Sequence, residues 1–329
     1  MLGRYVAFAS DASNLDRGDT NGQVDVFVRD VWEGRTRRVS LSTSGVQANY
    51  LTGWGTVAVS GDGGRVVFDS GATNLVPGDS NGAFDIFVHD VRTSRTERVS
   101  VGPGGRQGNF ESPLASISAD GRYVAFQSVA DNLVEGDTNG VGDVFVRDLK
   151  RGVTRRVSLS STGAQGDGFS GLGNINQIAI SADGRFVVFL SQASNLVPGD
   201  TNEEPDVFVR DVRRGITRRV SVSSTGQEAN GLTLAPSISA TGRFVVFVSA
   251  ANLTSEGTNG FVQVYIRDRR KGTTRLVSAG TASELSEAGA VTPQVSMDGA
   301  RVSFGSSSTN LVIGKRTNNA DIFVRRLPH

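Results

Sequence analysis

Residues 18–30 read GDTNGQVDVFVRD, and close copies of this stretch return five more times along the chain. The second half of the stretch, from Asp25, is a short strand-like run. The later copies of that run begin at Asp85, Asp143, Asp206, Gln263 and Asp321. Successive copies are therefore 60, 58, 63, 57 and 58 residues apart. A period of this size indicates a repeat architecture in which each repeat is one supersecondary unit.

Each repeat contains four strand signals, which the third repeat shows most clearly. Position A, at 115–118, and position B, at 123–126, flank an Asp-Gly turn, which is a strong hairpin signal. A long polar loop leads to position C, at 143–148, and a short turn containing Gly152 leads to position D, at 154–159. The sequence therefore predicts a meander of four antiparallel strands.

The hydrophobic patterns rank these four positions by depth. B and C carry consecutive apolar residues, such as Val187-Val188-Phe189, as expected of strands that are covered on both faces. D alternates polar and apolar residues, and we expect its arginines to point to solvent. A is short and rich in small residues, which suits inner strands that converge on an axis. A inside and D outside is the strand order of a β-propeller blade.

The strand signals add up to five A, six B, six C and five D strands, which makes 22. The first blade lacks its A strand and the last blade lacks its D strand. We therefore predict an all-β, six-bladed β-propeller in a single domain, residues 1–329. Its first and last blades are incomplete, with an open seam between them held by side-chain packing. The predicted blades cover residues 3–42, 56–101, 114–160, 177–223, 235–278 and 291–327.

Composition excludes several classes of protein. Charged residues make up 20% of the chain, the net charge is +1 and the arginines are spread over the repeats, so we expect no groove for nucleic acid. The absence of cysteine excludes disulfides, zinc fingers and cysteine nucleophiles. No apolar run approaches the roughly 18 residues that span a bilayer. The N-terminus also lacks the apolar core of a signal peptide.

The turn and strand motifs resemble the propeller repeats of the TolB family. They read SADGRYVAF at 118–126 and SADGRFVVF at 181–189, each followed by DVFVRD and TRRVS strands. The resemblance covers the whole chain, although the turns at 60–64 and 239–242 depart from the motif. It implies a bacterial, periplasmic or secreted binding module, or a non-catalytic domain beside an enzyme. Nothing in the chain matches the N-terminal domain through which TolB meets its partners.

The loop between B and C carries a recurring acidic pattern, Asp-x-Asn-Gly-x-x-Asp, in which Glu203 replaces the glycine in blade four. Ca²⁺ takes several carboxylate and amide oxygens, which acidic side chains around a glycine turn can supply. Calcium is therefore the one candidate cofactor. The candidate ligand sets are Asp19, Asn21 and Asp25; Asp79, Asn81 and Asp85; Asp137, Asn139 and Asp143; and Asp200, Asn202 and Asp206.

The same residues also suit a purely structural role. Asp and Asn close turns by binding backbone N–H groups, and Asn-Gly supplies positive φ angles. Blade five has Gly257 and Gln263 at the two aspartate positions, and blade six has Lys315 at the first. The turn thus survives where the charges do not, and calcium is expected in the first four blades at most.

The D-to-A connections lie on the same propeller face as the B-to-C loops, so amides and carboxylates gather there. Long loops on a rigid scaffold are where binding tends to reside. Aromatic and amide side chains together suit carbohydrate or peptide recognition, although the aromatic residues could also simply cover the core. The candidate ligand-binding residues are Gln47, Asn49, Tyr50, Trp54, Gln107, Asn109, Gln165, Asp167, Phe169, Gln227 and Asn230.

Residues that could catalyse a reaction are scarce. His89 and His329 are the only histidines, which disfavours a Ser-His-Asp triad. Paired carboxylates can hydrolyse glycosides, but no aspartate or glutamate stands out among its repeats. We predict a non-catalytic binding or scaffold module, monomeric, with a protein, peptide or glycan partner. The alternatives are a carbohydrate-active hydrolase or lyase with carboxylates at the channel mouth, and a structural repeat domain of a larger surface protein.

Overall fold

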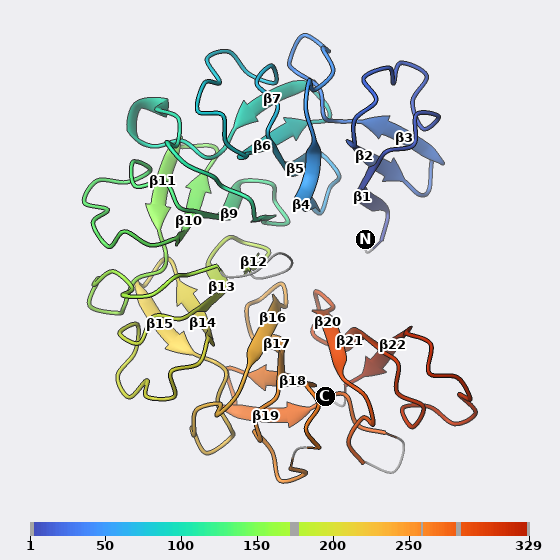
Figure 1. The fold of residues 1–329 in the computed structure, drawn as a ribbon, viewed down its shortest axis with the longest axis vertical. Coiled ribbons are helices and arrows are strands. Elements are labelled where there is room, and N and C mark those ends of the chain that lie inside the picture. The colour runs from blue at the N-terminus through green and yellow to red at the C-terminus, as the bar shows by residue number, and fades with distance from the viewer. Residues whose placement is uncertain (1–2, 172–177, 258, 281–283, 328–329) are drawn as a thin grey trace. The chain divides into compact units, whose positions relative to one another are not determined.

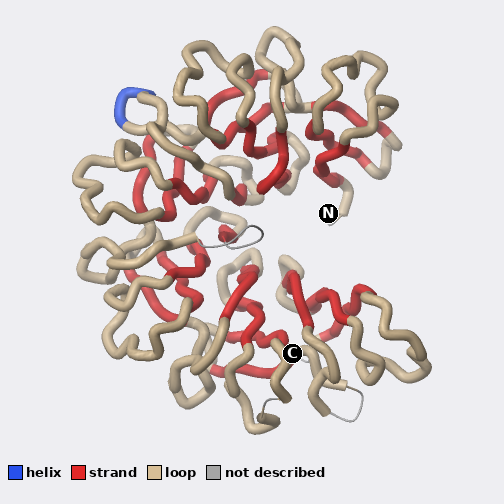
Figure 2. Tube along the Cα trace, in the orientation of Figure 1, coloured by secondary structure: helices blue, strands red, loops and turns tan. Residues whose placement is uncertain are grey.

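The computed structural model describes residues 3–171, 178–257, 259–280 and 284–327 (Figure 1). The chain forms two compact units, Met1–Val157 and Ser158–His329. Almost all regular structure in the described residues is β-strand, apart from a 3-10 turn at Pro103–Gly105 (Figure 2). The described residues contain no helix that is long and apolar enough to cross a membrane.

The first unit holds three antiparallel sheets. Blade one consists of β1 (Tyr5–Ser10), β2 (Asp25–Asp30) and β3 (Arg35–Arg38). Blade two consists of β4 (Thr52–Val59), β5 (Arg65–Ser70), β6 (Asp85–Asp90) and β7 (Arg95–Arg98). Blade three consists of β8 (Ala115–Ile117), β9 (Tyr123–Ser128), β10 (Asp143–Asp148) and β11 (Val153–Arg156).

The second unit holds three more antiparallel sheets. Blade four consists of β12 (Ile178–Ile180), β13 (Phe186–Ser191), β14 (Asp206–Asp211) and β15 (Ile216–Arg219). Blade five consists of β16 (Thr233–Ile238), β17 (Phe244–Ser249), β18 (Gln263–Asp268) and β19 (Thr273–Leu276). Blade six consists of β20 (Ala290–Val295), β21 (Arg301–Ser306) and β22 (Asp321–Arg326).

The sheets confirm the predicted strand count and blade type. The described residues form 22 strands in four sheets of four strands and two of three. Each sheet is a meander in which sequence neighbours pair, and the first and last sheets are the incomplete ones, as predicted. The fold class is that of a six-bladed β-propeller. The predicted single domain and its open seam stay predictions.

Within each unit the A strands of neighbouring blades lie side by side, β4 next to β8 in the first unit and β16 between β12 and β20 in the second. In blade one, which has no A strand, the B strand β1 lies next to β4 instead (Figure 1). Side chains tie these strands together. The backbone N–H of Ala115 donates to Thr56 Oγ1 at 2.8 Å, and Ser237 Oγ donates to Gln294 Oε1 at 3.1 Å. The A position is therefore the inner position of these blades, as the small residues predicted.

The core of each blade is an aromatic pair between its B and C strands. Phe68 of β5 stacks on Phe87 of β6 with ring centroids 6.1 Å apart, and Phe126 stacks on Phe145 at 5.6 Å. All four rings are fully buried. Such pairs contribute about 0.5–1.5 kcal/mol beyond the area that they bury. In blades two to five the B and C strands are therefore covered on both faces, as predicted. The prediction is wrong for β1 and β22 of the incomplete blades, where Val6, Ile322 and Val324 are exposed.

The prediction for the arginines of the D strands is wrong at one position in each of four blades. Arg38, Arg98, Arg156 and Arg219 point inward and are nearly covered, while most other D-strand arginines are exposed. A buried guanidinium needs anionic partners, because an unpaired charge is costly to remove from water. These partners lie in the B-to-C loops.

A second kind of ion pair holds the opposite end of the blades, at the A-to-B turn. Arg122 Nη2 lies 2.6 Å from Asp148 Oδ2, at the end of the C strand of the same blade. The equivalent pairs are Arg4–Asp30, Arg185–Asp211 and Arg243–Asp268, at 2.6–2.7 Å. Blade two lacks this arginine and has Gly64 in its place.

Candidate functional site

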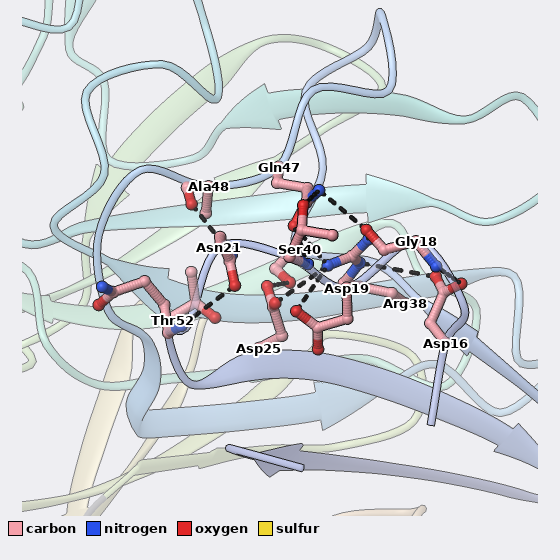
Figure 3. A network of polar contacts seen from close by, with 12 residues as sticks. Asp16, Gly18, Asp19, Asn21, Asp25, Arg38, Ser40, Gln47, Ala48 and Thr52 are labelled. Atoms are coloured by element: carbon pink, nitrogen blue, oxygen red, sulfur yellow. Dashed lines mark hydrogen bonds and ion pairs between the residues drawn. The ribbon is translucent and has the colours of Figure 1, made fainter. Parts of the chain in front are cut away.

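The polar loop of blade one is organised around Arg38, which comes from β3 (Figure 3). Its Nη1 lies 3.2 Å from Asp19 Oδ1 and 3.2 Å from Asp25 Oδ2. Its Nη2 donates to the carbonyl of Gly18 at 2.9 Å. Two carboxylates of the acidic motif thus share one guanidinium. We call this set, a D-strand arginine with two loop aspartates, the arginine cluster.

Two further side chains complete the arginine cluster of blade one (Figure 3). Gln47 accepts a hydrogen bond from Arg38 Nη1 at 2.9 Å and donates one to the Gly18 carbonyl at 2.9 Å. Ser40 Oγ donates to Asp25, whose strand it thereby anchors. Charge-assisted hydrogen bonds of this kind are stronger than neutral ones. The cluster therefore joins the loop, strand C, strand D and the D-to-A connection.

The asparagine of the motif closes the turn. Asn21 Nδ2 donates to the Ala48 carbonyl at 3.1 Å, and its Oδ1 accepts the N–H of Gln23 at 3.1 Å. In blade two, Asn81 donates to the Gly108 carbonyl at 2.9 Å in the same way. These bonds satisfy backbone groups, as the structural interpretation of the motif predicted.

Three more blades repeat the arginine cluster. In blade two, Arg98 lies 3.1 Å from Asp79 and 3.4 Å from Asp85. The other two sets are Arg156 with Asp137 at 3.0 Å and Asp143 at 3.2 Å, and Arg219 with Asp200 at 3.0 Å and Asp206 at 2.8 Å. Asn139 and Asn202 donate to the second aspartate of their own blade, at 3.0 and 3.1 Å. All twelve predicted metal ligands therefore belong to these four loops.

Blade five lacks all three charges of the arginine cluster. Gly257 and Gln263 stand at the two aspartate positions, and Leu276 stands at the arginine position. Ser278 Oγ donates to Gln263 Oε1 at 2.7 Å, so the neutral amide keeps the anchoring bond to strand C. The arginine and its carboxylates are absent together. This joint loss is expected if each of them is buried only because of the others.

Blade six has no D strand within the described residues, and its cation comes from the loop itself. Lys315 Nζ lies 2.8 Å from Asp321 Oδ2, and Asp321 occupies the position of the second aspartate. A carboxylate at the entry of strand C therefore has a cationic partner in each of the five blades that carry it.

Each arginine cluster holds two aspartates and one guanidinium, so negative charge is in excess. A third carboxylate lies near the arginine in two blades, Asp16 at 3.6 Å from Arg38 and Glu228 at 2.7 Å from Arg219. Burial raises the pKa of Asp137 to about 6, with Arg156 opposing the shift and Asp143 adding to it. Burial also raises the pKa of Asp200 to about 6, against the opposing effect of Arg219. Ionising both carboxylates at neutral pH therefore costs stability.

These contacts favour arginine over calcium as the cation of the loops. The aspartate oxygens that would bind Ca²⁺ already lie 2.8–3.4 Å from a guanidinium nitrogen, which would repel the ion. Across the residues that the structure describes, no group of three or more His, Cys, Asp or Glu side chains could hold a metal ion. Calcium binding stays a prediction, and the residues present fit it poorly.

Several of the polar side chains predicted to bind a ligand form hydrogen bonds with neighbouring loops. Asn49 donates to Thr73 Oγ1 at 2.9 Å and accepts the N–H of Thr73 at 3.0 Å. Asn109 makes the same two bonds with Asp131, at 2.8 and 3.2 Å. Asp167 accepts from Ser194 in the equivalent place of blade four, at 2.8 Å. These bonds leave little capacity for hydrogen bonds to a ligand.

The predicted glutamines and Asn230 lie in different settings. Gln107 donates to Asp79 at 2.8 Å within an arginine cluster, and Gln165 is half-buried in the corresponding connection. The residue that contacts Arg219 in blade four is Glu228, at 2.7 Å, rather than the neighbouring Gln227. Asn230 is exposed. Sequence reasoning missed Glu228, the four arginines and the serines that anchor strand C.

Blade two departs from the repeat at one strongly exposed aromatic residue. Trp54 lies in β4 and is 77% exposed. Glycines flank it on both sides. A Cβ on Gly53 would lie 2.8 Å from the side chain of Val26, and one on Gly55 would lie 2.6 Å from the carbonyl oxygen of Pro113. The backbone around Trp54 can approach its neighbours this closely only with glycine at both positions.

A buried carboxylate holds the segment of Trp54 in place. Asp69 of β5 is 1% exposed and accepts the N–H of Gly55 at 3.1 Å and of Thr56 at 2.8 Å. Burial raises the pKa of Asp69 to about 6, while these backbone hydrogen bonds oppose the shift. The carboxyl group therefore acts as an anchor for the backbone beside Trp54.

Asp69 has no charged counterpart in the other blades. Thr52 pairs with Ser70 and Val57 pairs with Phe68, so the four residues 53–56 bulge out opposite Asp69. The prediction that no carboxylate stands out among its repeats is therefore wrong. The equivalent B-strand residues of the other blades are Ala9, Gln127, Leu190, Val248 and Gly305.

Two more aromatic side chains are exposed on the D-to-A connections of the first unit. Tyr50 is 54% exposed and packs edge-on against Phe84, with ring centroids 6.4 Å apart. Phe110, which follows the next blade, is 55% exposed. In blade four, the predicted Phe169 is partly covered. We call Tyr50, Trp54 and Phe110 the aromatic surface of the first unit.

Several solved structures share the fold at low sequence identity. The acylaminoacyl peptidase of Pyrococcus horikoshii matches 100% of this chain with a TM-score of 0.53 and 10% identity. Dipeptidyl peptidase 4 of Porphyromonas gingivalis matches 98% with a TM-score of 0.52 and 15% identity. TolB from Acinetobacter baumannii, the protein type that the repeat motifs resemble, matches 92% with a TM-score of 0.49 and 15% identity.

The matches show the fold alone. This chain spans 45%, 42% and 57% of the lengths of those three chains, in the same order. No protein-family model matches the sequence, and no curated protein matches it.

If the charges of an arginine cluster depend on one another, removing the two carboxylates should restore the stability that is lost when the arginine is removed. Arg98→Leu should lower the free energy of unfolding by about 3–5 kcal/mol, because it leaves Asp79 and Asp85 buried beside each other without a cation. Adding Asp79→Gly and Asp85→Gln, which copies blade five, should recover most of that loss. Urea unfolding of the single and triple variants measures both effects. A triple variant less stable than Arg98→Leu would contradict the interdependence of the charges.

The raised pKa of Asp137 predicts a pH-dependent effect of Asp137→Asn. Its folded-state pKa of about 6 exceeds the unfolded value of about 3.9, so protonation stabilises the fold. That contribution is lost as the pH rises from about 4 to about 6. The free energy of unfolding of Asp137→Asn relative to wild type should therefore increase across this window and level off above it, in urea unfolding at a series of pH values.

Asp148→Asn is the matched control for this measurement. The hydrogen bond from Arg122 lowers the pKa of Asp148, so its ionised form already contributes stability above about pH 4. The difference between Asp148→Asn and wild type should be constant above about pH 5. If the stability difference between Asp137→Asn and wild type were also independent of pH, burial would not raise the pKa of Asp137.

Proposed function

We propose that this chain is a non-catalytic binding module that engages a partner through the aromatic surface of its first unit. The observation that carries the proposal is the presentation of Trp54. The two glycines that flank it leave no room for a Cβ, and a buried carboxylate without a counterpart in the other blades binds the adjacent backbone. Together they hold the side chain of Trp54 exposed to solvent. Nothing in the fold requires an exposed tryptophan there, and exposed aromatic residues on rigid supports are typical anchors of binding sites.

A peptide or protein segment suits this surface better than a glycan. Sugar recognition needs several hydrogen-bonding side chains beside the aromatic ring, and Asn49 and Asn109 already bind their own loops. The rings of Tyr50 and Trp54 instead offer apolar faces with one polar tip each. Such faces suit an extended peptide with an aliphatic or aromatic anchor.

The carboxylates support binding rather than hydrolysis. The loop aspartates of blades one to four share guanidinium groups. Asp69 is buried, and its oxygens accept backbone N–H groups. A general acid must reach its substrate within hydrogen-bond distance, and these groups are engaged elsewhere. We further propose a periplasmic or secreted, monomeric protein, on the resemblance of its repeats to those of TolB.

Trp54→Ala should weaken binding of peptides selected from a displayed random peptide library by about tenfold or more, as expected for an aromatic hot spot. Fluorescence polarisation with the selected peptides measures the effect. A glycan array probed in parallel with the same protein distinguishes the two classes of partner. If the protein binds glycans on the array and Trp54→Ala removes that binding, the partner is a glycan rather than a peptide.

Trp32→Ala is the matched control, because Trp32 is the other tryptophan of the chain and is 63% exposed at the opposite end of the blades. Its removal should leave peptide affinity unchanged. Equal losses in the two variants would show nonspecific adsorption to tryptophan and would overturn the proposed site.

Calcium is the remaining candidate cofactor, and the arginine clusters make a clear prediction for it. Because the guanidinium groups already lie beside the loop carboxylates where Ca²⁺ would have to bind, we expect neither EDTA nor millimolar CaCl₂ to shift the thermal midpoint of the wild-type protein. Differential scanning calorimetry measures this. A rise in the midpoint with CaCl₂ that Asp79→Asn removes would establish calcium stabilisation instead.

A further inference from the structure

The first unit contains a hollow of about 280 Å³ between blades one and two. It is lined by the start of β1, the end of β2, the outer strand β3 and the A-to-B turn of blade two. This is the end of the strands remote from the arginine clusters, because Tyr5 pairs with Asp30 at one end of β1 and Ser10 pairs with Asp25 at the other. The hollow is therefore separate from the aromatic surface.

The hollow is bordered by a departure from the repeat at Gly64. In blades three, four and five this position carries an arginine, such as Arg122, which pairs with the aspartate at the end of strand C. Gly64 has no positive φ angle, so its backbone does not require glycine. Blade two therefore presents no side chain at this position, and Asp90, the equivalent of Asp148, is reached instead by Arg65 at 3.5 Å.

Not every charged side chain that lines the hollow has a partner of opposite charge. Arg4 binds both Asp30, at 2.7 Å, and Glu33, at 3.1 Å. Arg92 binds Asp62 at 2.7 Å. These pairs account for the three lining carboxylates and for two of the four lining guanidinium groups.

The other two guanidinium groups belong to Arg35 and Arg37 of β3. Neither forms a hydrogen bond or an ion pair with any residue that the structure describes. Alternate residues of a strand point to the same face, so both side chains extend from β3 on the side of the hollow. No other D strand has arginine at both positions: blade two has Arg95 paired with Glu97 at 2.8 Å, and blade three has Val153 and Arg155.

We propose that this hollow binds a ligand that carries a phosphate or sulfate group, with Arg35 and Arg37 as the residues that hold the oxyanion. Two guanidinium groups on one strand face can each donate two parallel hydrogen bonds to oxygens of a tetrahedral anion. The ring of Tyr5 and the side chains of Val28 and Val91 give the hollow an apolar wall. The favoured ligand is therefore an oxyanion attached to an apolar group.

Isothermal titration calorimetry with phenyl phosphate, phenyl sulfate, inorganic phosphate and benzoate tests this site in the full chain. Phenyl phosphate should bind about tenfold more tightly than inorganic phosphate, because it also covers the apolar wall. The affinity should fall with added NaCl, as for other charge-based contacts. Benzoate binding as tight as that of phenyl phosphate would overturn the assignment to a tetrahedral oxyanion.

Three variants locate the binding. The double variant Arg35→Gln with Arg37→Gln should weaken phenyl phosphate binding by about tenfold or more. Arg155→Gln, at the same strand position of blade three, should leave it unchanged, and an equal loss there would show nonspecific attraction to surface arginines. Gly64→Arg introduces the arginine that blades one, three, four and five carry at this position, and it should abolish binding while the thermal midpoint is maintained. Full affinity in both the double variant and Gly64→Arg would exclude the hollow.

Discussion

The buried guanidinium that two loop carboxylates share is the interaction on which the polar face of these blades depends. In blades one to four it joins strand C, strand D, the B-to-C loop and, through Gln47 or its equivalents, the D-to-A connection. A buried charge is tolerated only with its partners in place. The long polar loops are therefore held in one conformation by ion pairs and hydrogen bonds, and blade five shows that a neutral amide can replace the whole set.

The repeats provide an internal reference against which single residues can be judged. A residue that recurs in most blades, such as the asparagine of the turn or the phenylalanine pair of the core, is explained by the blade itself. A residue that occurs in one blade only, and whose neighbours also differ from those in the other blades, needs another explanation. Asp69 with Trp54 is one such set, and Gly64 with Arg35 and Arg37 is another. They lie at opposite ends of the strands, so the two ligand sites that we propose for the first unit are separate from each other.

The acidic loops show how one sequence motif can suit two different cations. Carboxylates and amides spaced around a glycine turn are the donor set of a calcium loop, and Asp19, Asn21 and Asp25 have that spacing. Their partner Arg38 lies 13 residues beyond Asp25 on another strand, and its alternating pattern made it look exposed. Blade five carries Gln263 and Leu276 where the arginine clusters have an aspartate and an arginine. This joint replacement was the sequence signal that could have paired the loop aspartate with the D-strand arginine.

The sequence by itself determined the repeat length, the four strand positions, the 22 strands and the incomplete first and last blades. These features follow from local patterns, namely consecutive apolar residues, Asp-Gly turns and a period that returns along the chain. Only the tertiary structure decided which charges meet, where the loop amides are used and that Asp69 supports Trp54. Those contacts join residues on different strands, and pairing across a sheet depends on register and bulges, such as the one at residues 53–56, that no local pattern specifies.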